Sequence, residues 1–365
     1  MPTLPTSKAP NAVNGQTALE EMGFCAVLSR GGETRHAESK NANDFCPMLA
    51  DASVAWVDYV VGDNFEGESI EVAKTLGFSE LLVKNLLKNT RSGYEDFGNE
   101  MGLLLPAIRV RGFDVLLDPL LILIRENVIV TLHTIETRRF FRVRKYAETL
   151  LRKLPRGAPQ NDKITLLLIR LIEENNARNF DHLREIEEHG DELSAELLNT
   201  KSPPSRIGNK IYSMKHALIV YLGALWATVD ALDSLRYGDA DLLTDNPRIL
   251  DRIGGLIADV NGQIGLSEHM SEVLASGLEV LQSIYNNQLQ ILNNRLSLLV
   301  AYLTILGTAL IVPNTLATVA SVPVFPLDTK DQWWFLGVIV VSTVVSVVGM
   351  WIVVRKSGLM PHRPE

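Results

Sequence analysis

Two stretches near the end of the chain decide its fold: LSLLVAYLTILGTALIVPNTLATVASVPVFPL at residues 296–327 and QWWFLGVIVVSTVVSVVGMWIVV at residues 332–354. Neither contains a charged residue. About 20 apolar residues are enough for a helix to cross the ~30 Å hydrocarbon core of a bilayer. The sequence therefore predicts two transmembrane helices, over residues 296–322 and 332–354, joined by a short loop at residues 323–331.

The charges around these stretches predict how the hairpin is oriented. Arg295 precedes the first span, and Arg355, Lys356 and Arg363 follow the second, whereas the loop carries one Lys between two Asp residues. Basic residues next to a span favour the cytoplasmic side. We expect a multi-pass protein of the cell (inner or plasma) membrane, with both termini and the basic tail 355–365 in the cytoplasm and the loop outside.

Composition restricts the function of the part before the membrane. The chain has 365 residues, of which 46% are hydrophobic, and a net charge of −8. An acidic protein is not expected to bind nucleic acid, which requires clustered Lys and Arg. The sequence has no Gly-x-Ser-x-Gly elbow, no glycine-rich phosphate loop and no His-Glu-x-x-His motif. We expect no enzyme activity and no cofactor.

The first part of the chain has the pattern of an α+β domain. Polar residues 1–18 are expected to be a disordered tail, and a cytoplasmic α/β domain is expected over residues 19–160. Residues 69–76 and 79–87 have helical spacing, with Ser69 and Ser79 as candidate N-caps. Apolar and β-branched runs predict strands at residues 54–61, 101–110, 114–125 and 127–133. The spacing of these runs favours a mixed, partly antiparallel sheet flanked by helices.

The second part is predicted to be helical throughout. A charged helical hairpin is expected over residues 161–245, followed by a stalk helix over residues 246–295 that continues into the first span. Apolar residues recur every three or four positions from Leu274 to Leu303, across the membrane boundary. A single helix cannot bury such a stripe, so it implies packing against other helices of the chain or of symmetry-related copies.

Polar residues follow one face of this long helix. They occur at steps close to multiples of 3.6, the helical repeat, with one valine between them. Two explanations remain open: the residues join helices to each other, or they line a water-filled axis. Rings of amide and hydroxyl groups suit a cation that keeps its hydration shell, as Mg²⁺ does. The candidate pore-lining residues are Asn286, Asn293, Ser297, Val300, Gly307 and Thr315.

These motifs, taken in order, resemble the CorA-type divalent-cation transporters, a two-transmembrane superfamily named for a Gly-x-Asn motif. Trp56-Val57-Asp58 resembles the first strand motif of that family, and Asn294-Arg295-Leu296 resembles the segment that leads into its pore. The resemblance extends over nearly the whole chain from about residue 54. Its other parts are residues 76–95, 124–133, 183–193, 211–215 and 303–305, with Pro313 and Thr315.

The resemblance implies a funnel-shaped homopentamer in the bilayer whose long helices line a pore for metal cations. Two departures from the family pattern concern selectivity. Ser297 replaces the Asn usual at the cytoplasmic mouth, and Ala-Ser-Val-Pro at residues 320–323 replaces Gly-Met-Asn at the outer mouth. Ser321 is then the remaining candidate at that mouth, and Asp328 and Asp331 in the loop are expected to concentrate cations.

The resemblance also implies regulation by divalent ions bound between cytoplasmic domains. The candidate carboxylates are Asp259, Glu268 and Glu272, together with Glu279, Asp58 and Asp63. The expected function is transport of Mg²⁺ or related divalent ions through a pore gated by the cytoplasmic domain. Two alternatives remain: a related transporter for another ion, such as Zn²⁺ or a less selective range of cations, and a non-conducting membrane-anchored scaffold or sensor.

Overall fold

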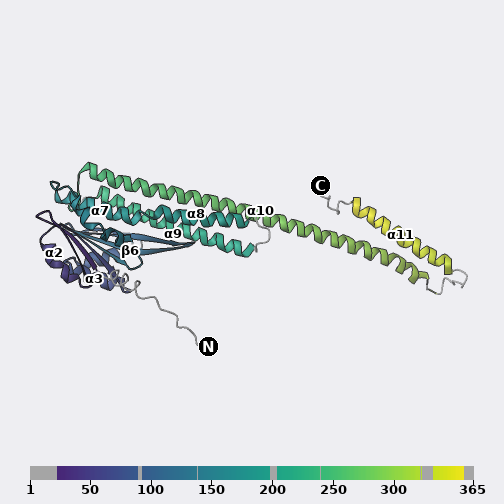
Figure 1. Cartoon of the computed structure of the whole chain (residues 1–365). Helices are drawn as coiled ribbons and strands as arrows, with labels where there is room; N and C mark the ends of the chain where they lie inside the picture. Colours follow the sequence, from purple (N-terminus) through teal and green to yellow (C-terminus); the bar gives the residue numbers. More distant parts are fainter. Residues whose placement is uncertain are drawn as a thin grey trace, which may run out of the picture. The chain divides into compact units, whose positions relative to one another are not determined.

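The computed structural model of the chain describes residues 23–88, 93–137, 139–197, 204–238, 240–320, 322 and 332–356. The chain divides into two compact units, Met1–Ser276 and Gly277–Glu365, and helix α10 (Pro247–Ala320) contributes to both (Figure 1). The predicted tail 1–18, the whole loop 323–331 and the end of the basic tail lie outside the described residues. So do Ser321, Asp328 and Asp331.

The first unit is built on a seven-stranded sheet in the order β2-β1-β3-β7-β6-β5-β4. Neighbouring strands pair antiparallel, except that β3 and β7 are parallel. The predicted mixed sheet is therefore confirmed. The strands are β1 (Gly23–Ser29), β2 (Thr34–Ser39), β3 (Ala52–Val61), β4 (Gly93–Asp96), β5 (Met101–Arg111), β6 (Asp114–Arg125) and β7 (Val128–Thr134).

The apolar runs in the sequence predict β3, β5, β6 and β7, whereas β1, β2 and β4 were not predicted. Both edge strands, β2 and β4, are short and polar, because each pairs on one side only and one face meets water. Such strands have no apolar run to identify them. In contrast, β3 lies inside the sheet and is mostly buried, which explains its β-branched and aromatic sequence.

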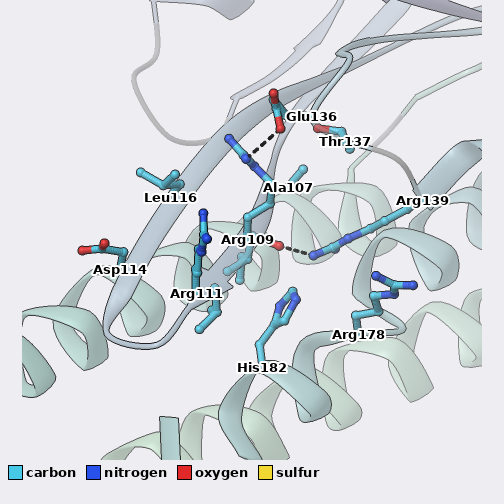
Figure 2. A pocket seen from close by; sticks show the side chains of 12 residues that line it. Ala107, Arg109, Arg111, Asp114, Leu116, Glu136, Thr137, Arg139, Arg178 and His182 are labelled. Atoms are coloured by element: carbon cyan, nitrogen blue, oxygen red, sulfur yellow. Dashed lines mark hydrogen bonds and ion pairs between the residues drawn. The ribbon is translucent and has the colours of Figure 1, made fainter. Parts of the chain in front are cut away.

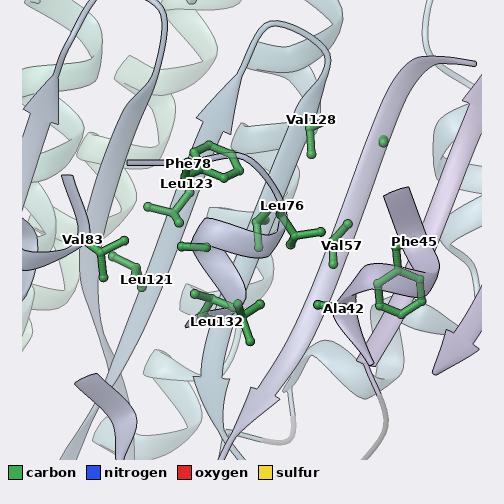
Figure 3. Close-up of a cluster of buried hydrophobic side chains, with 14 of the residues drawn as sticks. Ala42, Phe45, Val57, Leu76, Phe78, Val83, Leu121, Leu123, Val128 and Leu132 are labelled. Carbon is green, nitrogen blue, oxygen red and sulfur yellow. The ribbon is translucent and has the colours of Figure 1, made fainter. Parts of the chain in front are cut away.

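One face of the sheet is covered by helices α3 (Phe65–Thr75) and α4 (Glu80–Lys88), with the short η1 (Ala42–Phe45) and α2 (Cys46–Ala50) beside them. Their apolar side chains pack on alternate residues of the central strands, including Val57, Leu121 and Leu132 (Figure 3). Trp56, next to Val57 in β3, points to the opposite face and contacts Phe140 of α5 (Arg139–Arg144). The sheet is therefore the middle of three layers.

Helices α6 (Ala147–Arg152), α7 (Gln160–Asn176), α8 (Asn179–Leu197) and α9 (Pro204–Tyr237) contact the strands on this second side (Figure 1). Helix α9 is long and apolar enough to cross a membrane, but 56% of its most apolar window is buried against the rest of the unit. It packs on β5, β6 and α8, so its apolar character reflects a domain core. The predicted helical hairpin is present, but its first arm consists of two helices.

Of the two predicted N-caps, Ser79 is confirmed and Ser69 is not. Ser79 Oγ accepts a hydrogen bond from Leu82 N (3.3 Å) before α4, as predicted. Ser69 is not an N-cap, because α3 begins four residues earlier and Asn64 accepts from Gly67 N (3.2 Å) instead. Asn is as strong a capping residue as Ser. The prediction for Ser69 was wrong because the helical periodicity alone did not show that the helix starts earlier.

A buried carboxylate joins the sheet to the second helical layer. Asp58, which is fully buried in β3, accepts hydrogen bonds from His133 Nε2 (3.0 Å) and Thr131 Oγ1 (2.6 Å) in β7. Arg144 Nε of α5 donates to its other oxygen (2.7 Å). Burial by itself raises the pKa of Asp58, but the charges of His133 and Arg144 and these hydrogen bonds bring it well below its usual range. Asp58 therefore cannot be a metal ligand at a subunit surface, and that candidate was wrong.

We expect Asp58→Asn to destabilise the first unit by about 3–5 kcal/mol at pH 7, because it removes the buried carboxylate that pairs with the guanidinium of Arg144. Thermal unfolding of the detergent-solubilised protein, followed by near-UV circular dichroism, measures this. The matched control is Asp63→Asn, which changes an exposed carboxylate.

The folded-state pKa of Asp58 is below its unfolded value, so its stabilisation is present above about pH 4 and is lost as the pH falls further. The difference in unfolding temperature between the Asp58→Asn variant and the unchanged protein should therefore become smaller at acidic pH. Equal unfolding temperatures of the Asp58→Asn and Asp63→Asn variants at pH 7 would contradict a stabilising role for the hydrogen bonds around Asp58.

Candidate ion-conduction site

The second unit consists of the end of α10 and helix α11 (Gln332–Lys356). Their most apolar windows have mean hydropathies of 2.1 and 2.5, and neither window is buried by the part of the chain that the structure describes. Large apolar side chains such as Leu299, Leu306 and Val345 are more than half exposed. Water does not tolerate so much apolar surface, so a bilayer or other copies of the chain must cover it. These are the two helices that the sequence predicted to cross the membrane.

Aromatic residues mark both ends of α11. Trp333 and Trp334 begin the helix, and near its end the Arg355 guanidinium lies 5.3 Å from the ring centre of Trp351. From Trp333 to Trp351 the helix rises about 27 Å at 1.5 Å per residue. That distance is close to the thickness of the hydrocarbon core, and Trp and Arg prefer its interfaces. The spacing suits a helix that crosses the bilayer once.

The predicted polar residues share one face of α10. At about 100° per residue, Asn286, Asn293, Ser297, Val300, Gly307 and Thr315 fall within a sector of about 80°. The side chains on this face are exposed, and Gly307 is half-exposed. The structure therefore shows an uncovered polar face on an otherwise apolar helix. Ser321, the last predicted member, lies outside the described residues.

Two threonines on this face were missed. Thr304 and Thr318 fall in the same sector as Ser297 and Thr315, and Thr308 lies at its edge. The same 3.6-residue spacing would have found them from the sequence. With them, the face carries a hydroxyl at nearly every turn.

Each of these hydroxyls donates a hydrogen bond to the backbone carbonyl four residues earlier. Thr304 donates to Val300 (2.8 Å), Thr308 to Thr304 (2.9 Å), Thr315 to Ile311 (2.8 Å) and Thr318 to Asn314 (2.7 Å). The hydroxyl proton is thus satisfied inside the helix, which lowers the cost of placing it in hydrocarbon. The oxygen still has lone pairs to offer. The face therefore presents acceptors, which suit a cation or its hydration water.

The predicted regulatory carboxylates do not form one site in a single chain. Glu268 and Glu272 are exposed and one turn apart on α10, but Asp259 lies nine residues before Glu268, on the opposite side of the helix. Asp63 is exposed at the end of β3. Among the described residues, no group of three or more His, Cys, Asp or Glu side chains is placed to hold a metal ion. A site built from these acids needs residues from another copy.

The chain is similar to known proteins over most of its length. The sequence profile of the family described as "CorA-like Mg2+ transporter protein" matches residues 51–356. The CorA magnesium transporter from Methanocaldococcus jannaschii has a similar fold, with a TM-score of 0.68, 18% identity and coverage of 93% of this chain and 99% of that one. No curated protein sequence gives a significant match.

Two further solved structures share the fold. The full-length CmaX protein has a TM-score of 0.59 at 15% identity and covers 92% of this chain and 96% of its own. The ZntB cytoplasmic domain from Vibrio parahaemolyticus has a TM-score of 0.51 at 16% identity and covers 73% of this chain and 98% of its own. At these identities the similarity concerns the fold.

The hydroxyl face predicts which positions of α10 meet water. In a background of Cys25→Ala and Cys46→Ser, we expect Thr304→Cys to react with a membrane-impermeant thiol reagent at least about tenfold faster than Leu306→Cys on the opposite face. A thiol reacts as its thiolate, which forms in water and not in hydrocarbon. The rates are measured by mass spectrometry of protein in liposomes. Equal rates at the two positions would show that the threonines face protein or lipid.

Proposed function

The chain belongs to the CorA-like Mg2+ transporter family, and from this premise we propose that it moves metal cations across a membrane along the polar face of α10. The observation that carries the proposal is the row of threonine hydroxyls whose protons are all bound within the helix. Threonine hydroxyls whose protons are bound in this way present only acceptors to the outside, which favours cations over anions. Helix contacts alone would not require such an oxygen at nearly every turn.

A single helix cannot enclose an aqueous path, so the proposed pore requires several copies. We propose a homopentamer in which five α10 helices surround the axis and five α11 helices pack outside. The uncovered apolar sides of both helices support this arrangement, because they need lipid and neighbouring helices around them. Each polar position, from Asn286 to Thr315, then becomes a ring.

The orientation of the proposed pore follows from the charges at its ends. Arg355 and Lys356 are exposed at the end of α11 and favour the cytoplasmic side. Both termini and the first unit would then be cytoplasmic. The loop that carries Asp328 and Asp331 would face outward, where two carboxylates attract cations toward the mouth.

We propose that selectivity among divalent ions is weak. In the family, a Gly-Met-Asn segment forms the outer ring, and Gly permits the turn that aims its carbonyls. Here Ser321, Val322 and Pro323 stand in its place, with a stiff β-branched side chain and a proline of fixed φ. This departure also favours the second candidate function, transport of Zn²⁺ or of a less selective range of cations. A non-conducting scaffold has less support, because it would not need the hydroxyl face.

Gating by internal divalent ions is the remaining part of the proposal. Glu268 and Glu272 present two carboxylates on one exposed turn of α10, and Asp259 presents a third on the other side. In an assembly with α10 at its centre, the acids of one copy would lie close to those of the next. Carboxylate oxygens are the ligands that Mg²⁺ and Ca²⁺ prefer.

Flux into liposomes that hold the purified protein tests the proposed function. We expect uptake of Mg²⁺ and of other divalent cations at similar rates, with weak block by cobalt hexaammine, which mimics hydrated Mg²⁺. Thr304→Val should lower the flux at least about tenfold, since every copy around the axis loses a hydroxyl worth about 1 kcal/mol. Thr343→Val on α11 is the matched control, because its hydroxyl makes the same bond to Ile339 (2.7 Å) away from the proposed pore.

Two results of this experiment would contradict the proposal. Absence of flux for every ion would support the scaffold. Strong block by cobalt hexaammine together with a high preference for Mg²⁺ would mean that another feature replaces the missing outer motif.

Magnesium should also stabilise the assembled protein. We expect millimolar Mg²⁺ to raise the unfolding temperature, because an ion that binds only the folded state shifts the equilibrium toward it. The double variant Glu268→Gln, Glu272→Gln should lose at least half of this shift, whereas Glu187→Gln, an exposed acid on α8, should keep it. Differential scanning fluorimetry measures the shift. A full shift in the double variant would place the regulatory ion elsewhere.

A further inference from the structure

A second polar feature lies far from the membrane helices, in the first unit. A cavity of about 410 Å³ opens between the end of the β5–β6 hairpin and the start of α8. Figure 2 shows Arg109 and Arg111 on the strand side, Arg139 entering from α5, and Arg178 and His182 from the α8 side. Four guanidinium groups thus gather around one space in a chain whose net charge is −8.

Three of these four arginines have no carboxylate partner among the described residues. Arg109 pairs with Asp118 and Glu136. Arg139 is only 9% exposed and donates to the backbone carbonyls of Ile108 and Asn175, which carry no charge. Neither Arg111 nor Arg178 makes an ion pair within the part of the chain that the structure describes. Buried or clustered positive charge without a counter-ion is costly, so this arrangement calls for an anion.

Polar atoms in the cavity wall also lack partners. Thr137 is 2% exposed, and its Oγ1 makes no hydrogen bond with any residue that the structure describes. His182 Nδ1 also makes no hydrogen bond with a described residue. Burial, with the nearby charges of Arg139 and Arg178, lowers the pKa of His182 to about 4, so this side chain is neutral at pH 7. Hydroxyl and imidazole groups are both able to donate to an oxyanion.

We propose that this cavity binds a small molecule that carries a phosphate group. The cavity lining carries four arginines, and two carboxylates, Asp114 and Glu136, offset two of these charges. The remaining charge of about +2 matches a phosphate monoester, which carries about −1.5 to −2 at pH 7. Guanidinium groups bind phosphate oxygens in pairs of parallel hydrogen bonds.

The size and lining of the cavity support an organic body attached to this phosphate. A volume of about 410 Å³ lies in the range of small-molecule sites and exceeds what one phosphate fills. Ala107, Ile108 and Leu116 add apolar surface beside the charged groups. The phosphate would contact Arg139, Arg178 and Thr137, and the organic part would lie toward Leu116 and the hairpin.

Binding to the full-length protein in detergent, without divalent ions, tests this site. The probes are inorganic phosphate, AMP as a phosphomonoester, and adenosine as its uncharged counterpart, each titrated by calorimetry and by thermal shift. We expect saturable binding of phosphate and AMP, tighter for AMP, and none of adenosine.

Arg178→Gln should weaken AMP binding at least tenfold, and Arg178→Lys should restore part of it. Arg178 is exposed and has no partner in the described structure, so its replacement leaves the fold intact. Arg156→Gln is the matched control, because Arg156 is also exposed but does not line the cavity.

Three outcomes would overturn the proposal: no saturable binding of phosphate or AMP, equal binding by the Arg178 and Arg156 variants, and binding of adenosine as strong as that of AMP. If Arg178→Gln instead dissociates the oligomer in light scattering while phosphate has no effect, a carboxylate of a second copy fills the cavity. These measurements do not depend on ion flux, so failure here leaves the proposed transport untouched.

Discussion

The buried charge of Asp58 sets the geometry of the first unit. A carboxylate at the centre of a sheet is tolerated only with charged and hydrogen-bonding partners, and here they come from β7 and from α5. The requirement fixes α5 against the strands at one position. The other end of the same six-residue helix carries Arg139, which reaches the carbonyls of Ile108 and Asn175. One short helix thus completes the core at Arg144 and supplies a cation to the cavity at Arg139.

A different constraint governs the second unit. Hydrocarbon offers no hydrogen-bond partners, so each polar group on α10 must be satisfied within the helix or by another copy. The threonines meet this condition for their protons and leave their oxygens available. Asn286 and Asn293 have no such solution within one turn, since an amide has two N–H groups to satisfy. Their position nearer the first unit suits contact with water.

The family fold is retained at 18% identity to the archaeal CorA structure, while the outer motif has changed. Fold and selectivity depend on different residues. The sheet, the stalk and the two apolar helices require only patterns of burial, which many sequences satisfy. An outer ring requires a specific turn with specific donors, and four residues decide it. The fold therefore depends on burial patterns alone, and residues 320–323 are where this sequence departs from the family pattern at the outer mouth.

Much of this protein is determined by local sequence. Two uncharged apolar runs predict membrane helices because length and hydropathy alone decide insertion, and the repeat of 3.6 residues places Ser297, Val300 and Thr315 on one face of α10. Strands β3 and β5–β7 are predictable from the sequence because their buried positions leave long apolar runs. Tertiary structure alone decided the rest. Asp58 was predicted to be a surface ligand, because the sequence does not show that the fold brings Arg144, 86 positions later in the chain, next to it. Arg109, Arg139 and Arg178 are ordinary surface residues in the sequence, and only the packing of α5 and α8 on the β5–β6 hairpin brings them together, because charges distant along the chain acquire a common environment only when the chain folds.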